Sequence, residues 1–105
     1  MRTSKIGLPK ERIAEFCRKW RIVEFSLFGS VLRDDFSPSS DIDVLVVFED
    51  KTRWTLFDHV KMEQELSKII GRRANVVNRG ALERSANFIR RNTILETAER
   101  FYAAR

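Results

Sequence analysis

"LFGSVLRDDFSPSSDIDVLVVF", residues 27–48, places a Gly-Ser pair at the end of one apolar run and an Asp-x-Asp pair at the start of the next. The first run, residues 22–29, is short and rich in β-branched and aromatic residues, which predicts a strand that stops at Gly29. The second run, residues 41–48, is apolar on both faces beyond its first three residues, which predicts a strand covered on both sides near its far end. Between the two strands, Ser30 is expected to cap a short helical turn, and residues 36–40 are expected to form a loop.

The Asp-x-Asp pair predicts a metal site. Because strand side chains alternate, Asp41 and Asp43 point to the same side of the sheet, with Cβ atoms roughly 7 Å apart. Two carboxylates this close repel each other unless a cation lies between them. The chain has one histidine and one cysteine, both elsewhere, so the pair offers oxygen ligands. Such ligands suit Mg²⁺ or Mn²⁺, with substrate phosphates completing the coordination shell.

The Gly-Ser pair predicts a phosphate site. Gly29 has no side chain to block a phosphate, and Ser30 offers a hydroxyl and an amide at a helix start, where the dipole favours negative charge. Arg33, one turn further on, adds a positive charge. A Gly-Ser or an Asp-x-Asp alone is common in turns and strand starts, and Asp41 alone is more often a loop-ending cap. The joint arrangement favours phosphoryl or nucleotidyl transfer with metal assistance.

The rest of the chain predicts a small sheet with helices packed on it. Helices are expected at 9–20, where Ile13, Phe16, Cys17 and Trp20 form an apolar stripe, and at 54–70, where Gly71 supplies the C-cap. A short strand is expected at 74–78. The residues expected to mark a C-terminal amphipathic helix are Ile94, Leu95, Ala98, Phe101 and Tyr102. The resulting α-β-α-β-α-β-α order predicts one α/β domain over residues 1–105 with a mixed sheet.

Composition bounds the class of protein. The chain has 105 residues, 43% hydrophobic and 33% charged, as in an ordinary globular domain. Its longest apolar run, residues 44–48, is far too short for a membrane span, and the single Cys17 fits a reducing compartment, so a cytoplasmic protein is expected. The net charge of +5 lies in the last third, where residues 72–105 contain eight Arg and three Glu. This third is expected to face an acidic partner or to be a solvated surface.

The central stretch resembles the minimal nucleotidyltransferases, a branch of the polymerase-beta-like nucleotidyltransferase superfamily. The matching residues are Gly29-Ser30, Arg33 and Ser40-Asp41-Ile42-Asp43, followed by the apolar residues 44–47. The resemblance also covers the chain length, the leading helix, the "GRRANVV" stretch at 71–77 and a C-terminal helix. It implies that Ser30 contacts the phosphates of ATP or another nucleoside triphosphate, and that Asp41 and Asp43 bind two divalent metals, Mg²⁺ or Mn²⁺.

Members of this family often resemble antitoxins encoded beside a helical HEPN-type toxin, and some transfer AMP onto a hydroxyl of that partner. The chain departs from the family in the later strand, where the third carboxylate is replaced by Asn75. An amide oxygen ligates a metal weakly and cannot act as a general base. Asn75 therefore joins Asp41 and Asp43 in the predicted catalytic set, with impaired catalysis as the expectation.

The sequence leaves two other hypotheses about function open. The chain could be a weakened family member that binds its partner and nucleotide but does little chemistry. It could also be a small nucleic-acid-binding module that uses its arginine-rich last third. Against the latter, the interleaved aromatic and basic pattern of such modules is missing, and the two carboxylates would repel a phosphate backbone. His59, Trp20 and Trp54 are interpreted as structural, although a proton shuttle and base stacking are their functional alternatives.

Overall fold

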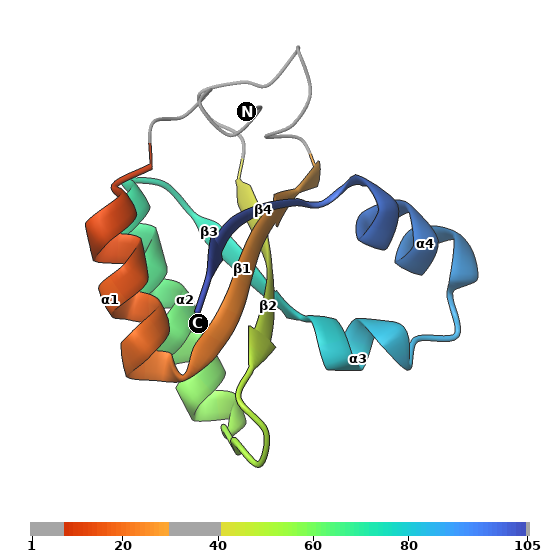
Figure 1. Cartoon of the computed structure of the whole chain (residues 1–105), viewed down its shortest axis with the longest axis horizontal. Helices are drawn as coiled ribbons and strands as arrows, with labels where there is room; N and C mark the ends of the chain where they lie inside the picture. Colours follow the sequence, from red (N-terminus) through yellow and green to blue (C-terminus); the bar gives the residue numbers. More distant parts are fainter. Residues whose placement is uncertain (1–7, 30–40, 105) are drawn as a thin grey trace.

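The computed structural model describes residues 8–29 and 41–104 and has a sheet between two unequal helical layers (Figure 1). The elements, in chain order, are α1 (Lys10–Trp20), β1 (Ile22–Phe28), β2 (Ile42–Phe48), α2 (Leu56–Ile70), β3 (Ala74–Asn78), α3 (Arg79–Glu83), α4 (Phe88–Thr97) and β4 (Glu99–Ala103). Helices α1 and α2 lie on one side of the sheet, and α3 and α4 lie on the other (Figure 1). The predicted α/β class is confirmed.

The described residues form a mixed sheet with the strand order β3-β2-β1-β4. Strand β1 is antiparallel to both β2 and β4, whereas β2 and β3 run parallel and are joined by the crossover helix α2. Strand β2 is thus covered on both edges, which agrees with its apolar sequence. Its side chains alternate, with Val44 and Val46 fully buried on one face and Asp43 and Leu45 on the other.

The larger core lies between the sheet and helices α1 and α2. The predicted stripe of α1 is buried as expected, with Ile13 and Cys17 at 0% exposure. From α2, Met62 and Leu66 complete this core. Burial raises the pKa of the Cys17 thiol from 9.0 to about 12, because the thiolate would lose its hydration. Cys17 therefore behaves as a small core residue, as predicted.

Helix α2 begins later than predicted because Thr55 caps it. The Thr55 hydroxyl accepts a hydrogen bond from the Asp58 backbone N–H, and the Asp58 carboxylate accepts one from the Thr55 N–H, which forms a capping box. Trp54 precedes the helix and packs edge-on against Trp20, with ring centroids 5.1 Å apart. At the other end, Gly71 is the predicted left-handed C-cap, with φ +87°.

A second, smaller core covers the opposite face of the sheet. It consists of Phe28 and Leu45 from the sheet, Leu82 from α3 and Ile94 from α4. Because this cluster is small, α3 and α4 cover only part of that face. The end of the sheet where β1 stops and β2 starts is left partly open, and Asp43 lies there, adjoining the pocket described below.

The predicted C-terminal helix is wrong beyond Thr97. The helix ends where Ala98 takes an extended conformation (φ −61°, ψ 137°), and the chain continues as β4. Phe101 and Tyr102 pack against the larger core from that strand. The physical reason is the free edge of β1, whose backbone groups gain partners from β4. The short helix α3 was not predicted either. The turn predicted at Ser30 lies outside the described residues.

Within the described ranges, the longest helix is α2, with 15 residues, and none of the helices is both long and apolar enough to cross a membrane.

Candidate functional site

The predicted catalytic residues meet at one end of the central strand pair. The parallel register places Asp43 of β2 beside Asn75 of β3, and Asp41 directly precedes β2. The Asn75 side-chain amide donates hydrogen bonds to both carboxylates, with Nδ2 3.0 Å from Asp43 Oδ1 and 3.3 Å from Asp41 Oδ2. The amide therefore lies between the two carboxylates and stabilises their negative charge.

Gly29 is held against the same carboxylate from the other side. Phe28, the last residue of β1, pairs with Asp43 in the antiparallel register, so the next residue lies beside the Asp43 side chain. A Cβ added to Gly29 would lie 2.6 Å from Asp43 Oδ2. Gly29 also has φ +79°, a conformation that L side chains rarely adopt. The backbone conformation therefore favours glycine here, and a side chain at this position would displace the Asp43 carboxylate.

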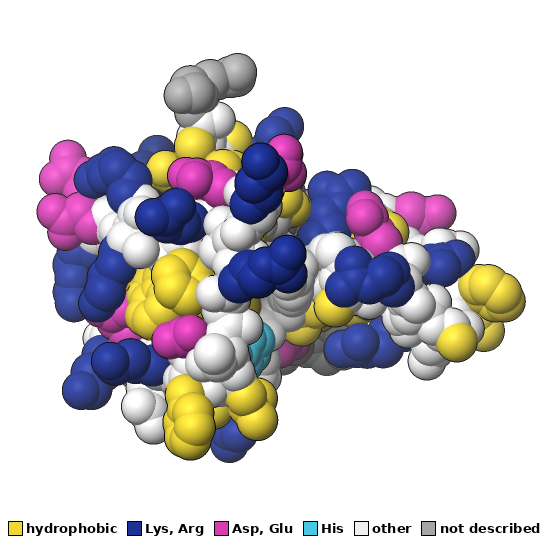
Figure 2. Space-filling model, turned by 90° about the horizontal axis from the view of Figure 1, so that it is seen from below, with side chains coloured by type: hydrophobic (Ala, Val, Ile, Leu, Met, Phe, Trp, Pro, Cys, Tyr) yellow, Lys and Arg dark blue, Asp and Glu magenta, His cyan; other side chains and the backbone are white. Residues whose placement is uncertain are grey.

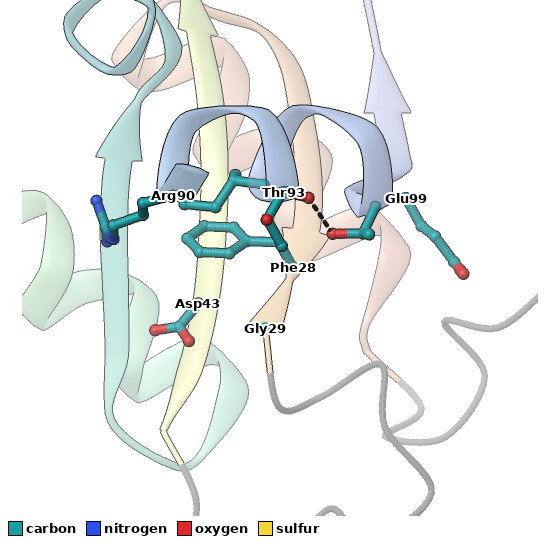
Figure 3. Close-up of a pocket in the computed structure, with 8 residues that line it drawn as sticks. Phe28, Gly29, Asp43, Arg90, Thr93 and Glu99 are labelled. Carbon is teal, nitrogen blue, oxygen red and sulfur yellow. Dashed lines mark hydrogen bonds between the residues drawn. The ribbon is translucent and has the colours of Figure 1, made fainter. Parts of the chain in front are cut away.

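A pocket of about 790 Å³ opens beside Asp43 and Gly29. Phe28 and Ile94 contribute apolar surface to it. Its remaining lining residues are Arg90, Thr93, Thr97 and Glu99 (Figure 3). The sequence-based prediction gave the α4 residues no role in the site. Positions 90, 93, 94 and 97 nevertheless follow the i, i+3, i+4, i+7 spacing of one helix face.

Helix α2 fixes the outer edge of β3, next to Asn75. The Glu63 carboxylate accepts a hydrogen bond from the Val76 backbone N–H at 2.7 Å, and the Ser67 hydroxyl accepts one from the Ala74 N–H at 2.9 Å. These contacts satisfy edge-strand donors that would otherwise face solvent. His59 Nε2 lies 3.3 Å from Glu63 Oε2, so the histidine belongs to this edge and does not line the pocket.

The other acidic residues near Asn75 in sequence have partners elsewhere. Glu65 accepts hydrogen bonds from Lys19 at 2.7 Å and from Trp20 at 2.5 Å. Partial burial raises the pKa of Glu65, but these hydrogen bonds and the Lys19 charge outweigh it, so the pKa lies below its usual value. Glu83 pairs with Arg79. Among the described residues, none of these carboxylates replaces the missing third one beside Asp41 and Asp43.

The candidate metal ligands in the described part of the chain are therefore two carboxylates and one amide. No group of three or more Asp, Glu, His or Cys side chains that could hold a metal occurs within residues 8–29 and 41–104. The donors that are present are hard oxygens, and substrate phosphates can complete such a set around Mg²⁺ or Mn²⁺. The predicted phosphate residues Ser30 and Arg33 lie outside the described residues.

The arginine-rich last third is only partly available to a partner. Arg79 and Arg100 both lie near Glu24, with nitrogen–oxygen distances of 3.8 and 3.6 Å. Arg91 donates to the Ser85 carbonyl at 3.3 Å and its guanidinium lies over the Phe88 ring. Figure 2 shows the molecule from below relative to Figure 1. On the face drawn there, Lys and Arg side chains lie on both the α1–α2 side and the α3–α4 side.

Comparison with known proteins identifies the family to which the chain belongs. Residues 10–99 match the nucleotidyltransferase domain family. The chain belongs to that family. A protein of Methanocaldococcus jannaschii, provisionally named a protein adenylyltransferase, is 32% identical over 68 residues, 65% of this chain and 71% of its own length. The protein adenylyltransferase MntA of Thermococcus cleftensis is 29% identical over 69 residues, 66% of this chain and 68% of its own length.

Solved structures agree with the resemblance to minimal nucleotidyltransferases. One described as a minimal nucleotidyltransferase is 30% identical, with a TM-score of 0.63 over 85% of each chain. A toxin–antitoxin structure with AMP-PNP has a TM-score of 0.70 at 18% identity, covering 93% of this chain and 76% of that chain. A tri-AMPylated Shewanella oneidensis HEPN toxin in complex with an MNT antitoxin gives 0.60 at 18% identity, covering 90% and 70%. At that identity, the last two show a shared fold.

Proposed function

We propose that this nucleotidyltransferase-family chain transfers AMP from ATP to a hydroxyl group of a HEPN-type partner protein and acts as its antitoxin. The observation that carries the proposal is the convergence of Asp41, Asp43 and Asn75, where Asp43 and Gly29 also line a pocket. Relatives named protein adenylyltransferase and a structural neighbour in complex with an AMPylated HEPN toxin support the choice of AMP and of the partner.

The site residues divide the work between metal and phosphate. Asp41 and Asp43 would hold Mg²⁺ or Mn²⁺, and Asn75 would become a weaker ligand if its side chain turned its amide oxygen, in place of its N–H group, toward them. When bound, such an ion polarises phosphoryl oxygens and offsets their charge. Gly29 lets the Asp43 carboxylate keep its position, because a Cβ there would lie 2.6 Å from Oδ2. Ser30 and Arg33, which follow Gly29 in the sequence, remain the residues proposed to contact the phosphates.

The proposed reaction is a displacement at the α-phosphorus. The partner's hydroxyl oxygen forms a bond to that phosphorus, and the bond from the phosphorus to the oxygen that bridges to the β-phosphate breaks. Pyrophosphate leaves with the electron pair of the broken bond, and the hydroxyl proton passes to water. The residues of the chain orient the nucleotide for in-line attack, and such positioning accounts for much of the rate gain in phosphoryl-type transfers.

A second candidate function is favoured by Asn75 itself. An amide carries no charge and cannot accept the hydroxyl proton, and Asn75 in this structure donates its N–H groups to the two carboxylates. A chain of this kind could bind nucleotide and partner tightly while transferring AMP slowly. Inhibition of the toxin would then come from binding.

Transfer of label from α-labelled ATP to the purified partner separates these functions. We expect labelling that depends on divalent metal and falls about 10²–10³-fold in Asp43→Asn, because phosphate charge is then poorly compensated. Asp50→Asn, an exposed turn residue away from the pocket, is the matched control and should label like the parent. Unchanged labelling by Asp43→Asn would refute the site. Nucleotide binding with no labelling by the parent would favour the second candidate.

A further inference from the structure

The pocket beside Asp43 has a wall that the family motif does not include. One face of α4 forms it, with Arg90, Thr93 and Thr97 stacked at helical spacing. The Thr97 hydroxyl donates to the Thr93 backbone carbonyl at 2.6 Å, so that hydroxyl is already used (Figure 3). Arg90 belongs to the first turns of the helix. In Figure 3 its side chain extends to the side of the pocket on which the Asp43 carboxylate lies.

Arg90 differs from Arg79, Arg91 and Arg100, because its side chain has no partner in the described structure. Arg79, Arg91 and Arg100 are each held by carboxylates or backbone carbonyls. Within residues 8–29 and 41–104, the Arg90 guanidinium makes no hydrogen bond or ion pair, although Asp43 and Glu99 line the same pocket. An unpaired guanidinium over a pocket is free to bind an incoming anion.

The negative charge gathered at the pocket favours a positively charged side chain there. Asp41 and Asp43 are both negative, and a nucleoside polyphosphate brings several further negative charges to the same place. Metal ions compensate part of this charge. Arg90 is the positively charged side chain among the described residues that line the pocket. A guanidinium is suited to this role because its planar fork matches two phosphate oxygens.

We propose that Arg90 of α4 binds the polyphosphate chain of the nucleotide, on the side of the pocket where the Asp43 carboxylate lies. This inference rests on the proposed function, because it concerns the same nucleotide. It assigns α4 to the substrate site and explains why the helix presents an arginine to the pocket. Phe28 and Ile94 are apolar and buried, and the guanidinium is the positively charged group of the described wall, beside the polar Thr93, Thr97 and Glu99.

The test compares Arg90→Ala, Arg90→Lys and Arg84→Ala in calorimetric titrations with ATP, ADP and AMP at saturating Mg²⁺. Arg84 is also exposed but does not line the pocket, so it controls for net charge. We expect Arg90→Ala to weaken ATP binding about 10–100-fold and AMP binding much less, as for a lost charge-assisted contact to the outer phosphates. Arg90→Lys should recover part of the loss, and Arg84→Ala should match the parent.

The outcomes separate this inference from the proposed function. If the parent binds ATP and Arg90→Ala binds it equally well, or loses ATP and AMP affinity to the same extent, the role of Arg90 is refuted and the proposed function stands. If the parent binds none of the nucleotides, both are refuted. Equal thermal unfolding midpoints of Arg90→Ala and the parent are expected, because the residue is exposed and its hydrogen bond to Asn87 comes from the backbone N–H, which the variant keeps.

Discussion

A Cβ atom on Gly29 would lie 2.6 Å from the Oδ2 atom of Asp43, so the end of β1 and the carboxylate of β2 are packed without room for a side chain. This contact joins two parts of the motif that lie apart in the sequence. The glycine is needed to leave the carboxylate in its place.

Gly29→Ala should therefore abolish nucleotide binding more than it affects folding. Gly71→Ala is a matched control, because Gly71 has φ +87° and nothing lies within 4 Å of an added Cβ. Both variants should lose about 1–2 kcal/mol of stability from the left-handed backbone. The Gly29 variant alone should displace Asp43 and lose nucleotide affinity. Denaturant unfolding and calorimetry measure the two effects, and unimpaired binding by Gly29→Ala would contradict the site geometry.

Asn75→Asp should raise activity and make stability dependent on metal. The substitution removes an amide that donates to both carboxylates and adds a third negative charge beside them. Without metal, we expect a loss of about 1–2 kcal/mol in unfolding free energy. With Mg²⁺, the loss should be recovered, and AMP transfer should rise by about 10²-fold or more if a general base is restored.

Thermal unfolding with Mg²⁺ and with chelator, followed by the transfer assay, measures both effects of Asn75→Asp. A parent that already transfers rapidly, together with a variant that is no faster, would show that another group supplies the missing function. The role assigned to Asn75 would then be wrong.

Glu63→Ala should destabilise β3 and, through it, the position of Asn75. The variant removes the acceptor for the Val76 N–H, a charge-assisted bond of 2.7 Å on a partly exposed edge. We expect a loss of about 1 kcal/mol and faster hydrogen exchange at Val76. Gln64→Ala, the exposed neighbour, should leave exchange at Val76 unchanged. Equal exchange in the two variants would contradict the assigned contact.

Cys17 should be unreactive in the native protein at pH 8. Its pKa is raised to about 12 by burial, so the protonated thiol is favoured by folding. This contribution to stability is present below the unfolded pKa of about 9 and is lost as the pH rises from there toward 12. Labelling with a thiol reagent should be slow in buffer and fast in denaturant. Rapid native labelling would show that α1 is not packed as described.

The fold was largely predictable because its decisive signals are local. The helix expected over 9–20, the Gly71 cap and the apolar runs of β1 and β2 are each set by neighbouring residues. The structure agrees with them, except that Pro9 is the N-cap and α1 begins at Lys10. The strand β4 was not predictable in this way. Phe101 and Tyr102 continue the helical spacing of Ile94 and Ala98, and only the open edge of β1 makes the extended conformation preferable.

The candidate site, too, was predictable from the sequence only in part. Asp41, Asp43 and Asn75 were identified from a motif, and the structure brings them within hydrogen-bond distance of one another. Arg90 lies far away in sequence and reaches the pocket because α4 folds back over Phe28 and Leu45. The helical spacing of positions 90, 93, 94 and 97 indicates a shared helix face, but what that face contacts depends on tertiary packing.

The most direct test is a calorimetric titration of ATP into the purified chain, with Mg²⁺ and with a chelator, for the parent and for the double variant Asp41→Asn/Asp43→Asn. The carboxylates would repel the triphosphate unless metal ions compensate their charge. We therefore predict binding by the parent with Mg²⁺, weak binding with the chelator, and loss of the metal-dependent part in the double variant. Equal affinity of the parent and the double variant in Mg²⁺ would contradict the assignment of Asp41 and Asp43 as the metal–nucleotide site.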